Sequence, residues 1–275
     1  MFECVINVSE GRDEAVLGDL SAAGGPSLRD RHSDAFHHRS VFTLINDRDR
    51  LVRDVRTLIG AAYQRLDLAD HQGVHPRFGV VDVVPFVALE RARASEAVTL
   101  RDQTANWIAA AFAVPVFLYG PLADGSLRTL PEVRRGAFAA LRPDLGPDQP
   151  SPARGSVAVG ARPILVAWNL WLDGVNVAQA RSMASAIRRP AVRALAFEVG
   201  DEVQVSCNIV DTDAARPSEL YDQVGSLLPA GATIRRAELV GLAPASLVTS
   251  EDRSRWAQLG LSSDSTIEAR CGRQI

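Results

Sequence analysis

The chain has 275 residues, of which 47 % are hydrophobic, and its 30 basic and 33 acidic side chains leave a net charge of −3. This length suggests two domains, and the hydrophobic content is enough for a sizeable core. The balanced charge argues against a protein that binds nucleic acid, because phosphate binding needs a basic surface.

The N-terminus and the cysteines indicate the compartment. The first residues, MFECVINVSEGRDE, lack the basic start and apolar segment of a secretory signal. No apolar run reaches the roughly 18 to 20 residues of a membrane span. Cys4, Cys207 and Cys271 are odd in number and far apart, which argues against a disulfide framework. We therefore expect a soluble, cytoplasmic protein with reduced thiols and no membrane partner.

The first half of the chain is expected to form a sheet with helices packed on it. Its apolar runs predict strands over residues 2–7, 27–33, 40–46, 78–87 and 114–120. Helical spacing is found over residues 12–23, 47–66 and 95–113. The helix over 47–66 has the clearest signal, because its apolar residues recur every 3.6 positions and Asp47 stands at the N-cap.

Proline and glycine become dense over residues 141–163, which predicts a linker or a structured loop between two halves. After it, strands are expected over 163–172, on both sides of a hairpin turn at Gly200–Asp201, and over 233–242. Helices are expected over 176–188 and 217–228.

The order strand–helix–strand–strand–helix–strand is clear in the second half, and the first half has the same order with an additional helix and strand. This order predicts an α/β (α+β) protein with two split-βαβ, ferredoxin-like subdomains. Each subdomain is expected to be a mixed sheet with helices packed on one face.

One short stretch, HQGVHPRFG at residues 71–79, concentrates the residues capable of chemistry. Gly73 and Pro76 favour a fixed loop that leads into the following strand. His75 in such a loop can accept or donate a proton near pH 7. Arg77 supplies a permanent positive charge for a carboxylate.

The histidines also permit other interpretations. All five lie in the first third of the chain, at positions 32, 37, 38, 71 and 75. His71 and His75, completed by His37 and His38, resemble a zinc-ligand pair, but that spacing needs a helix, which Gly73 and Pro76 disfavour. A histidine that only hydrogen-bonds within its loop is the simplest alternative for His75, and the default for His32, His37 and His71.

Two further segments carry weaker signals. In NVSEGR, Ser9, Gly11 and the N–H groups of a helix start can bind an anion, or can form an ordinary capped loop. GSVAVGAR has two glycines five residues apart, which is too loose for a dinucleotide fingerprint.

Several motifs together resemble one family, the glutamate formiminotransferases, found as the N-terminal part of formiminotransferase-cyclodeaminase. ECVINVSEGR resembles the family's E-C-V-P-N-F-S-E-G, HRSVFT its N-R-[ST]-V-x-T, and HQGVHPRFGVVDVVPF its H-x-G-E-H-P-R-M-G-A-x-D-V-x-P-F. VPVFLYG, LGPDQPSPARGSVAVGAR, QVSCNIVD and ELVGLAP also resemble family segments, in the family's order. The resemblance extends from residue 3 to about residue 250 and does not include the cyclodeaminase part.

The resemblance implies a transferase of one-carbon metabolism that moves a formimino group from N-formimino-L-glutamate to N5 of tetrahydrofolate in histidine breakdown. It implies a formiminotransferase N-terminal subdomain over residues 1–161, a C-terminal subdomain over 162–275, and a substrate groove between them. Tetrahydrofolate is then a co-substrate, no metal is expected, and a homodimer is an expectation.

The resemblance also assigns site residues. His75 is the expected general acid/base, and Asp34 is expected to orient it or to bind the cationic formimino group. Arg39 and Arg77 are expected to hold carboxylates. The substrate-binding set is Asn7, Glu10, Asp34, Arg39, Arg77 and Arg162. The expected folate-binding segment is Gly146, Pro147, Asp148, Gln149, Pro150, Ser151, Pro152, Ala153, Arg154 and Gly155.

The chain departs from the family pattern at several positions. His38 replaces an asparagine, Val74 a glutamate and Arg154 a tryptophan, and the loop over 187–195 is shorter. These departures leave two alternatives open: a folate-dependent glutamate formyltransferase, or a diverged, non-catalytic paralogue that binds folate or another small molecule.

Overall fold

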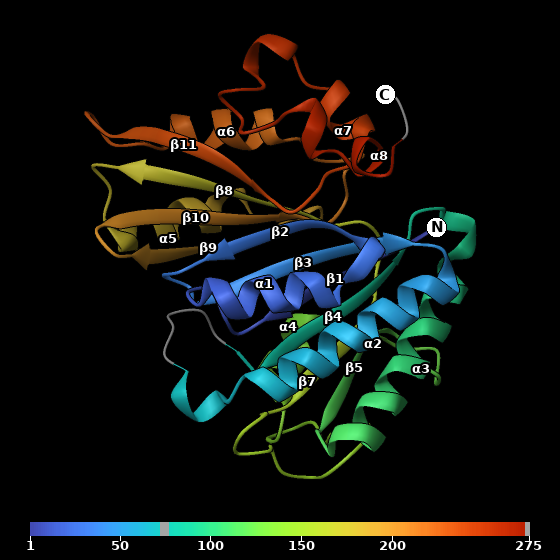
Figure 1. The fold of residues 1–275 in the computed structure, drawn as a ribbon. Helices are drawn as coiled ribbons and strands as arrows, with labels where there is room; N and C mark the ends of the chain where they lie inside the picture. Colours follow the sequence, from blue (N-terminus) through green and yellow to red (C-terminus); the bar gives the residue numbers. More distant parts are fainter. Residues whose placement is uncertain (72–76, 273–275) are drawn as a thin grey trace. The chain divides into compact units, whose positions relative to one another are not determined.

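The computed structural model describes residues 1–71 and 77–272. Their contacts divide the chain into two compact units, Met1–Pro163 and Ile164–Ile275 (Figure 1). Each unit has its own hydrophobic core. In the described residues no helix is both long and apolar enough to cross a membrane.

The first unit is built on a seven-stranded sheet with the strand order β2-β3-β1-β4-β7-β5-β6. The strands are β1 (Phe2–Val8), β2 (Leu28–Asp34), β3 (Arg39–Asn46), β4 (Val81–Ala88), β5 (Val116–Pro121), β6 (Leu127–Arg128) and β7 (Val157–Ala161). The helices are α1 (Glu14–Ala23), α2 (Arg48–Arg65), α3 (Ala94–Phe112) and α4 (Leu130–Gly136). The first four strands pair antiparallel, whereas β7 pairs parallel with β4 and β5, so this sheet is mixed as predicted.

Three of these helices cover one face of the sheet, as expected for a split-βαβ unit (Figure 1). Helix α2 begins where predicted, because the Asp47 carboxylate accepts a hydrogen bond from the N–H of Arg50 at 3.1 Å. Helix α4 departs from the expectation. Its Val133 packs with Phe117 and Tyr119 in a separate cluster, so the helices of this unit do not all lie on one face of the sheet.

The proline- and glycine-rich segment is only partly the loop predicted from its composition. Its residues Val157–Ala161 form β7, which is inserted between β4 and β5. This strand is short, and its apolar run contains Gly160, which hid it among the turn-forming residues. Helix α4 and the two-residue β6 were also missed, although Thr129 and Glu132 form a capping box that signals the start of α4.

The second unit contains a four-stranded sheet with the order β11-β8-β10-β9. Its elements are β8 (Val166–Asp173), α5 (Val177–Ile187), β9 (Val192–Val199), β10 (Glu202–Ile209), α6 (Pro217–Ser226), β11 (Thr233–Val240), α7 (Ala245–Thr249) and α8 (Ile267–Arg270). Helices α5 and α6 cover one face, and the predicted hairpin turns at Gly200, where φ is 62°. Helices α7 and α8 were not predicted.

The pairings between the described strands of this second sheet are all antiparallel, so the expectation of a mixed sheet is wrong for this unit. The reason lies in the split-βαβ order itself. Strands β8 and β9 run in the same direction, but β10 is inserted between them and pairs antiparallel with both.

Candidate functional site

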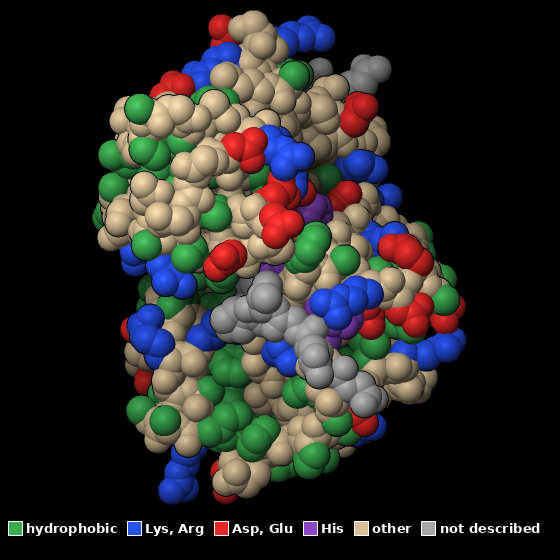
Figure 2. Space-filling model, turned by 90° about the vertical axis from the view of Figure 1, so that its left-hand side faces the viewer, with side chains coloured by type: hydrophobic (Ala, Val, Ile, Leu, Met, Phe, Trp, Pro, Cys, Tyr) green, Lys and Arg blue, Asp and Glu red, His purple; other side chains and the backbone are tan. Residues whose placement is uncertain are grey.

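The histidines and arginines of the first unit form the main concentration of polar chemistry. Figure 2 shows histidine side chains on one face of the molecule, among basic and acidic side chains. Because the chain contains no lysine, every basic side chain in this view is an arginine. This face therefore offers forked guanidinium donors, which suit carboxylates.

Three segments that lie far apart in the sequence meet at the side chain of Arg39, at the start of β3. The carbonyl oxygen of the Asn7 side chain accepts hydrogen bonds from Nε and Nη2 of Arg39, at 3.2 and 2.8 Å. Arg39 Nη1 donates to a carboxylate oxygen of Asp82. Asn7, Arg39 and Asp82 come from three different strands, β1, β3 and β4, and their side chains share one face of the sheet.

Asp82 occupies an irregular position in β4. The pairing of β1 with β4 shifts between Asn7, opposite Val83, and Val8, opposite Val81, which leaves Asp82 as the extra residue of a β-bulge. A bulge redirects the side chain of the extra residue and is frequent beside active sites. Here it turns a carboxylate toward the arginine in the middle of an apolar strand.

Asp82 is fully buried and strongly paired. Its Oδ1 accepts the backbone N–H of Phe78 at 2.7 Å, and its Oδ2 accepts Nη2 of Arg134 at 2.6 Å in addition to Arg39. Burial alone would raise the pKa of Asp82, but the positive charges of Arg39 and Arg134 outweigh it and lower the pKa to about 2. Asp82 is therefore an ionised anchor and not a proton donor near neutral pH.

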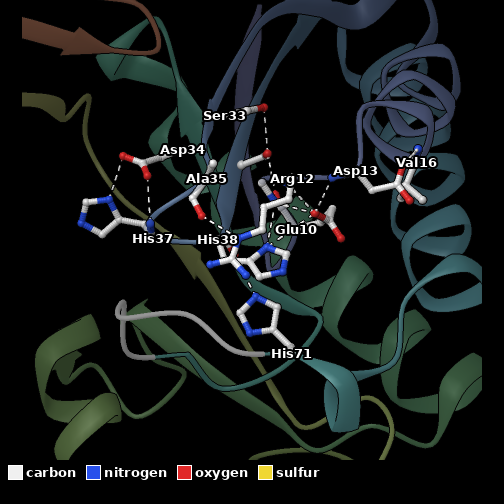
Figure 3. A network of polar contacts seen from close by, with 12 residues as sticks. Glu10, Arg12, Asp13, Val16, Ser33, Asp34, Ala35, His37, His38 and His71 are labelled. Carbon is white, nitrogen blue, oxygen red and sulfur yellow. Dashed lines mark hydrogen bonds and ion pairs between the residues drawn. The ribbon is translucent and has the colours of Figure 1, made fainter. Parts of the chain in front are cut away.

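In the loop after β1, the Glu10 carboxylate accepts hydrogen bonds from the backbone of the same loop. One oxygen, Oε1, accepts the backbone N–H groups of Gly11, Arg12 and Asp13 at 2.7–3.0 Å (Figure 3). These are the N–H groups that the sequence offered as an anion site, and the chain's own carboxylate occupies them. Gly11 is required here, because a Cβ would lie 2.2 Å from the carbonyl oxygen of Asp34.

His38 and His71 stack on each other, with ring centroids 4.2 Å apart (Figure 3). His71 Nε2 donates to the His38 carbonyl oxygen at 2.8 Å, and His38 Nδ1 accepts the N–H of Gly11 at 3.1 Å. Burial lowers the pKa of both imidazoles, and for His38 the neighbouring His71 lowers it further. His71 therefore supports the turn that carries His38, which agrees with its expected role in the loop.

Asp34 pairs with His37. Its Oδ2 lies 2.8 Å from His37 Nδ1, and its Oδ1 accepts the backbone N–H groups of Phe36 and His37 (Figure 3). Burial raises the pKa of Asp34, but the hydrogen bonds and charge of His37 outweigh this and lower it to about 2. In the described residues, Asp34 thus fixes the turn between β2 and β3. Its expected action on His75 stays a prediction, because His75 lies outside them.

Arg77 is the first described residue after residue 71. Its Nη2 donates to the carbonyl oxygen of His71 at 2.6 Å, which brings its guanidinium beside the stacked histidines. The loop residues Gly73, Val74, His75 and Pro76 lie outside the described residues. The expected acid/base and the departure at Val74 therefore stay predictions of the sequence.

Arg162 belongs to a different cluster of the first unit. Its side chain bonds the Tyr119 hydroxyl and donates to the carbonyl oxygen of Pro163 at 2.9 Å, and it lies near Glu3. Glu3 is 4 % exposed, and burial raises its pKa to about 7 against the lowering effect of Arg162. This cluster shares the sheet with Asn7 and Arg39 but has its own partners.

The expected folate segment, residues 146–155, is attached to the first unit at both ends. Gly146 has a φ of 82° and Gly155 a φ of 71°, which only glycine readily adopts. Gly155 forms a bridge with Gly79, which leads into the strand of Asp82. The Arg154 guanidinium donates to the Phe112 carbonyl oxygen at 3.0 Å and lies over the ring of Tyr63, so it is held within this unit.

The sequence did not single out Asp82 or Arg134. A signal for Asp82 existed, because a charged residue within the apolar run of 78–87 is rarely buried without a partner. Arg134 follows the capping box of α4, but nothing local connects it with Asp82. For metals, no group of three or more His, Cys, Asp or Glu side chains in the described ranges is placed to hold an ion.

Comparisons with known proteins agree with the motifs that meet in this site. The family model described as "Formiminotransferase domain, N-terminal subdomain" matches residues 1–162. The glutamate formimidoyltransferase of Streptococcus pyogenes serotype M1 is 34 % identical, over 89 % of both chains. That of Thermoplasma acidophilum is 31 % identical, over 89 % of this chain and 88 % of its own.

A third relative, the formimidoyltransferase-cyclodeaminase of Sus scrofa, is 29 % identical over 89 % of this chain but only 50 % of its own length. The similarity therefore covers most of the length of both glutamate formimidoyltransferases but only half of the formimidoyltransferase-cyclodeaminase. The chain belongs to the formiminotransferase family and is a one-carbon group transferase.

Proposed function

We propose that this protein transfers the formimino group of N-formimino-L-glutamate to N5 of tetrahydrofolate. The observation that carries the proposal is the meeting of three family-like motifs at one hydrogen-bonded cluster. Asn7 comes from ECVINVSEGR, Arg39 from HRSVFT, and Asp82 from HQGVHPRFGVVDVVPF. Relatives named glutamate formimidoyltransferase support the same donor.

The proposed reaction needs one group that moves a proton twice. N5 attacks the formimino carbon and gives a tetrahedral adduct, after which the bond from that carbon to the glutamate nitrogen breaks. A general base takes the proton from N5, and the same group then gives a proton to the departing nitrogen. We assign this role to His75, because neutral imidazole can do both near pH 7.

The described residues supply charge rather than proton transfer. Asp34 and Asp82 both have pKa values near 2 and stay ionised, while Arg39 is bonded to Asp82 and Arg77 to the carbonyl oxygen of His71. Formiminoglutamate has two carboxylates, which suit these arginines. Holding donor and acceptor together contributes the orientation that a two-substrate reaction requires.

The test is the variant H75A, assayed by release of glutamate from formiminoglutamate in the presence of tetrahydrofolate. We expect an unchanged fold by circular dichroism and a fall in kcat of about 100- to 10,000-fold, the usual contribution of a positioned acid/base. H71A is the matched control, because His71 supports the neighbouring turn. Undiminished turnover in H75A would remove His75 from the mechanism.

The alternatives give different outcomes. A formyltransferase would release glutamate from N-formylglutamate faster than from formiminoglutamate. A non-catalytic paralogue would bind tetrahydrofolate in a calorimetric titration and turn over neither donor. Some parts of the proposal rest on the family resemblance. They are the folate segment 146–155, the subdomain division after residue 161 with its groove, a place in histidine breakdown, a cytoplasmic location and a homodimer.

A further inference from the structure

Three segments of the first unit meet at His38: the loop after β1, the turn between β2 and β3, and the residues before β4 (Figure 3). The His38 ring stacks on the His71 ring, with an interplanar angle of 28°. His71 Nε2 donates to the His38 carbonyl oxygen, and the backbone N–H of Gly11 donates to His38 Nδ1. His38 stands where the family pattern has an asparagine, so the stack is not part of that pattern.

The hydrogen bonds of the stack fix where each ring carries its proton. A carbonyl oxygen can only accept, so His71 is protonated on Nε2. A backbone N–H can only donate, so His38 Nδ1 carries no proton, and the neutral ring is protonated on Nε2. His71 Nδ1 is buried and has no hydrogen-bond partner among the described residues. A second proton on His71 would therefore bury an N–H group without an acceptor, which costs free energy.

The charged groups around the stack do not compensate a second proton on His38. Glu10 Oε1 lies 3.5 Å from His38 Nδ1, but this oxygen already accepts three backbone N–H groups. Arg12, in the same loop, and Arg77, before β4, place positive charge near both rings. Two stacked imidazolium rings would also repel each other.

The other titratable groups of this turn are paired separately. Asp34 Oδ2 lies 2.8 Å from His37 Nδ1, and the His37 ring points away from the stack (Figure 3). The carboxylate of Asp34 therefore does not offset charge on the stacked rings.

Burial is the largest cause that lowers the pKa of His38 and His71 from the ordinary value of 6.5. The folded chain thus favours the neutral rings. The stability that they provide is complete above about pH 6.5 and is lost as the pH falls below this value.

Each ring lies beside a residue of the proposed site. Arg39 follows His38 in the chain, and Arg77 Nη2 donates to the His71 carbonyl oxygen. We propose that His38 and His71 are positioning residues, which hold the turn of Arg39 against the residues before β4 while both rings are neutral, and release it when either is protonated. The effect on turnover rests on the proposed function, but the protonation of the rings does not.

The direct test is a histidine NMR titration of the full chain, which has five histidines. Long-range proton–nitrogen spectra at about pH 7.5, assigned with H38N and H71N, should show both rings neutral and protonated on Nε2. Both rings should titrate below pH 6.5, and the backbone amide resonance of Arg39 should change with the same midpoint. A stacked ring protonated on Nδ1, or an Arg39 amide that does not follow the rings, would overturn the proposal.

H38N tests the coupling between the rings. Asparagine tolerates the left-handed φ of 50° at this position, and the backbone carbonyl that accepts from His71 remains, so this variant should keep the turn. The midpoint of His71 should rise in H38N, because loss of the stacked ring exposes it to water. An unchanged midpoint contradicts the proposal.

Kinetics measure the consequence for the site. The ratio of kcat/KM for formiminoglutamate at about pH 7.5 to that at about pH 5.5 should be at least about threefold larger in the wild type than in H38N, because only the wild type loses the stack on acidification. H32N is the matched control, since it makes the same change at a histidine of β2 that is not part of the stack, and its ratio should equal that of the wild type. Equal ratios in H38N and the wild type reject the positioning role and keep the proposed function. No turnover by the wild type at either pH rejects the proposed function, and the NMR titration then decides whether the stack holds the turn.

Discussion

The two units share a strand order but differ in what they bury. Of the charged side chains buried in the described residues, five lie in the first unit and one in the second: Glu3, Glu10, Asp54, Asp82 and Arg101 against Glu251. The two units also differ in how many non-glycine residues have a positive φ. The described non-glycine residues with positive φ, His38, Ala113 and Phe138, all belong to the first unit, whereas glycines hold these conformations in the second.

Both features cost free energy, because a buried charge loses its hydration and a side chain in the left-handed region meets its own backbone. Such costs persist where the surrounding structure enforces them, and they concentrate at functional sites. The difference agrees with our proposal that most of the site residues lie in the first unit. Four substitutions in the first unit test how much of this free-energy cost is related to function.

The largest effect is expected for Asp82→Asn. This variant leaves two guanidinium groups facing each other without their shared carboxylate, which should lower the free energy of unfolding by about 3–5 kcal/mol. We also expect kcat/KM for formiminoglutamate to fall at least about 100-fold, because Arg39, which we propose holds a substrate carboxylate, loses its anchor. Chemical denaturation and steady-state kinetics measure the two effects.

The double variant D82N/R134M sharpens this prediction. It removes one of the two facing cations, so it should recover part of the stability that D82N loses, without recovering activity. A D82N protein as stable as the wild type would show that the buried carboxylate is not the partner of both arginines.

A smaller, pH-dependent effect is expected for Glu3→Gln. Burial raises the pKa of Glu3 to about 7 in the folded chain from 4.5 in an unfolded one, so the folded state holds the proton more tightly. The stability that the neutral form provides is complete below about pH 4.5 and is lost as the pH rises through 7. The glutamine variant should therefore match the wild type at low pH and exceed it by about 2–3 kcal/mol above pH 7.

Urea unfolding between pH 4 and 8 measures this difference. Parallel stability curves for E3Q and the wild type would mean that Glu3 is ionised at little cost, and that the neighbouring Arg162 compensates its burial. In that case the buried charges of the first unit would be better balanced than the comparison of the units indicates.

How far the sequence predicts this molecule depends on how local the determining contacts are. Helix α2 and the hairpin at Gly200 follow from residues within one or two turns, and both were predicted. The partners of Asp82 lie 43 and 52 positions away, at Arg39 and Arg134, and no local pattern connects them. The role of His75 came from resemblance to a family, since a loop histidine alone has several equally good explanations.

The smallest effect is expected for Ala113→Gly. This variant tests whether the backbone strain of a positive φ has only a structural role. Ala113 is exposed at the end of α3 with φ of 51°, and its N–H donates to the Ala109 carbonyl oxygen as in an ordinary helix end. Glycine removes the cost of the Cβ, roughly 1–2 kcal/mol, but gains freedom in the unfolded chain, so a net stabilisation of about 0.5–1 kcal/mol is expected. Turnover should not change.

Phe138→Gly is the matched comparison, because Phe138 has a similar φ of 61° but packs edge-on against the buried Phe117, with ring centroids 5.0 Å apart. Losing that contact should outweigh the relief of strain, so thermal unfolding should move in the opposite direction from A113G. If both glycine variants gain stability equally, the strain at Phe138 is not held by its aromatic contact. The positive φ values of the first unit would then carry no information about its function.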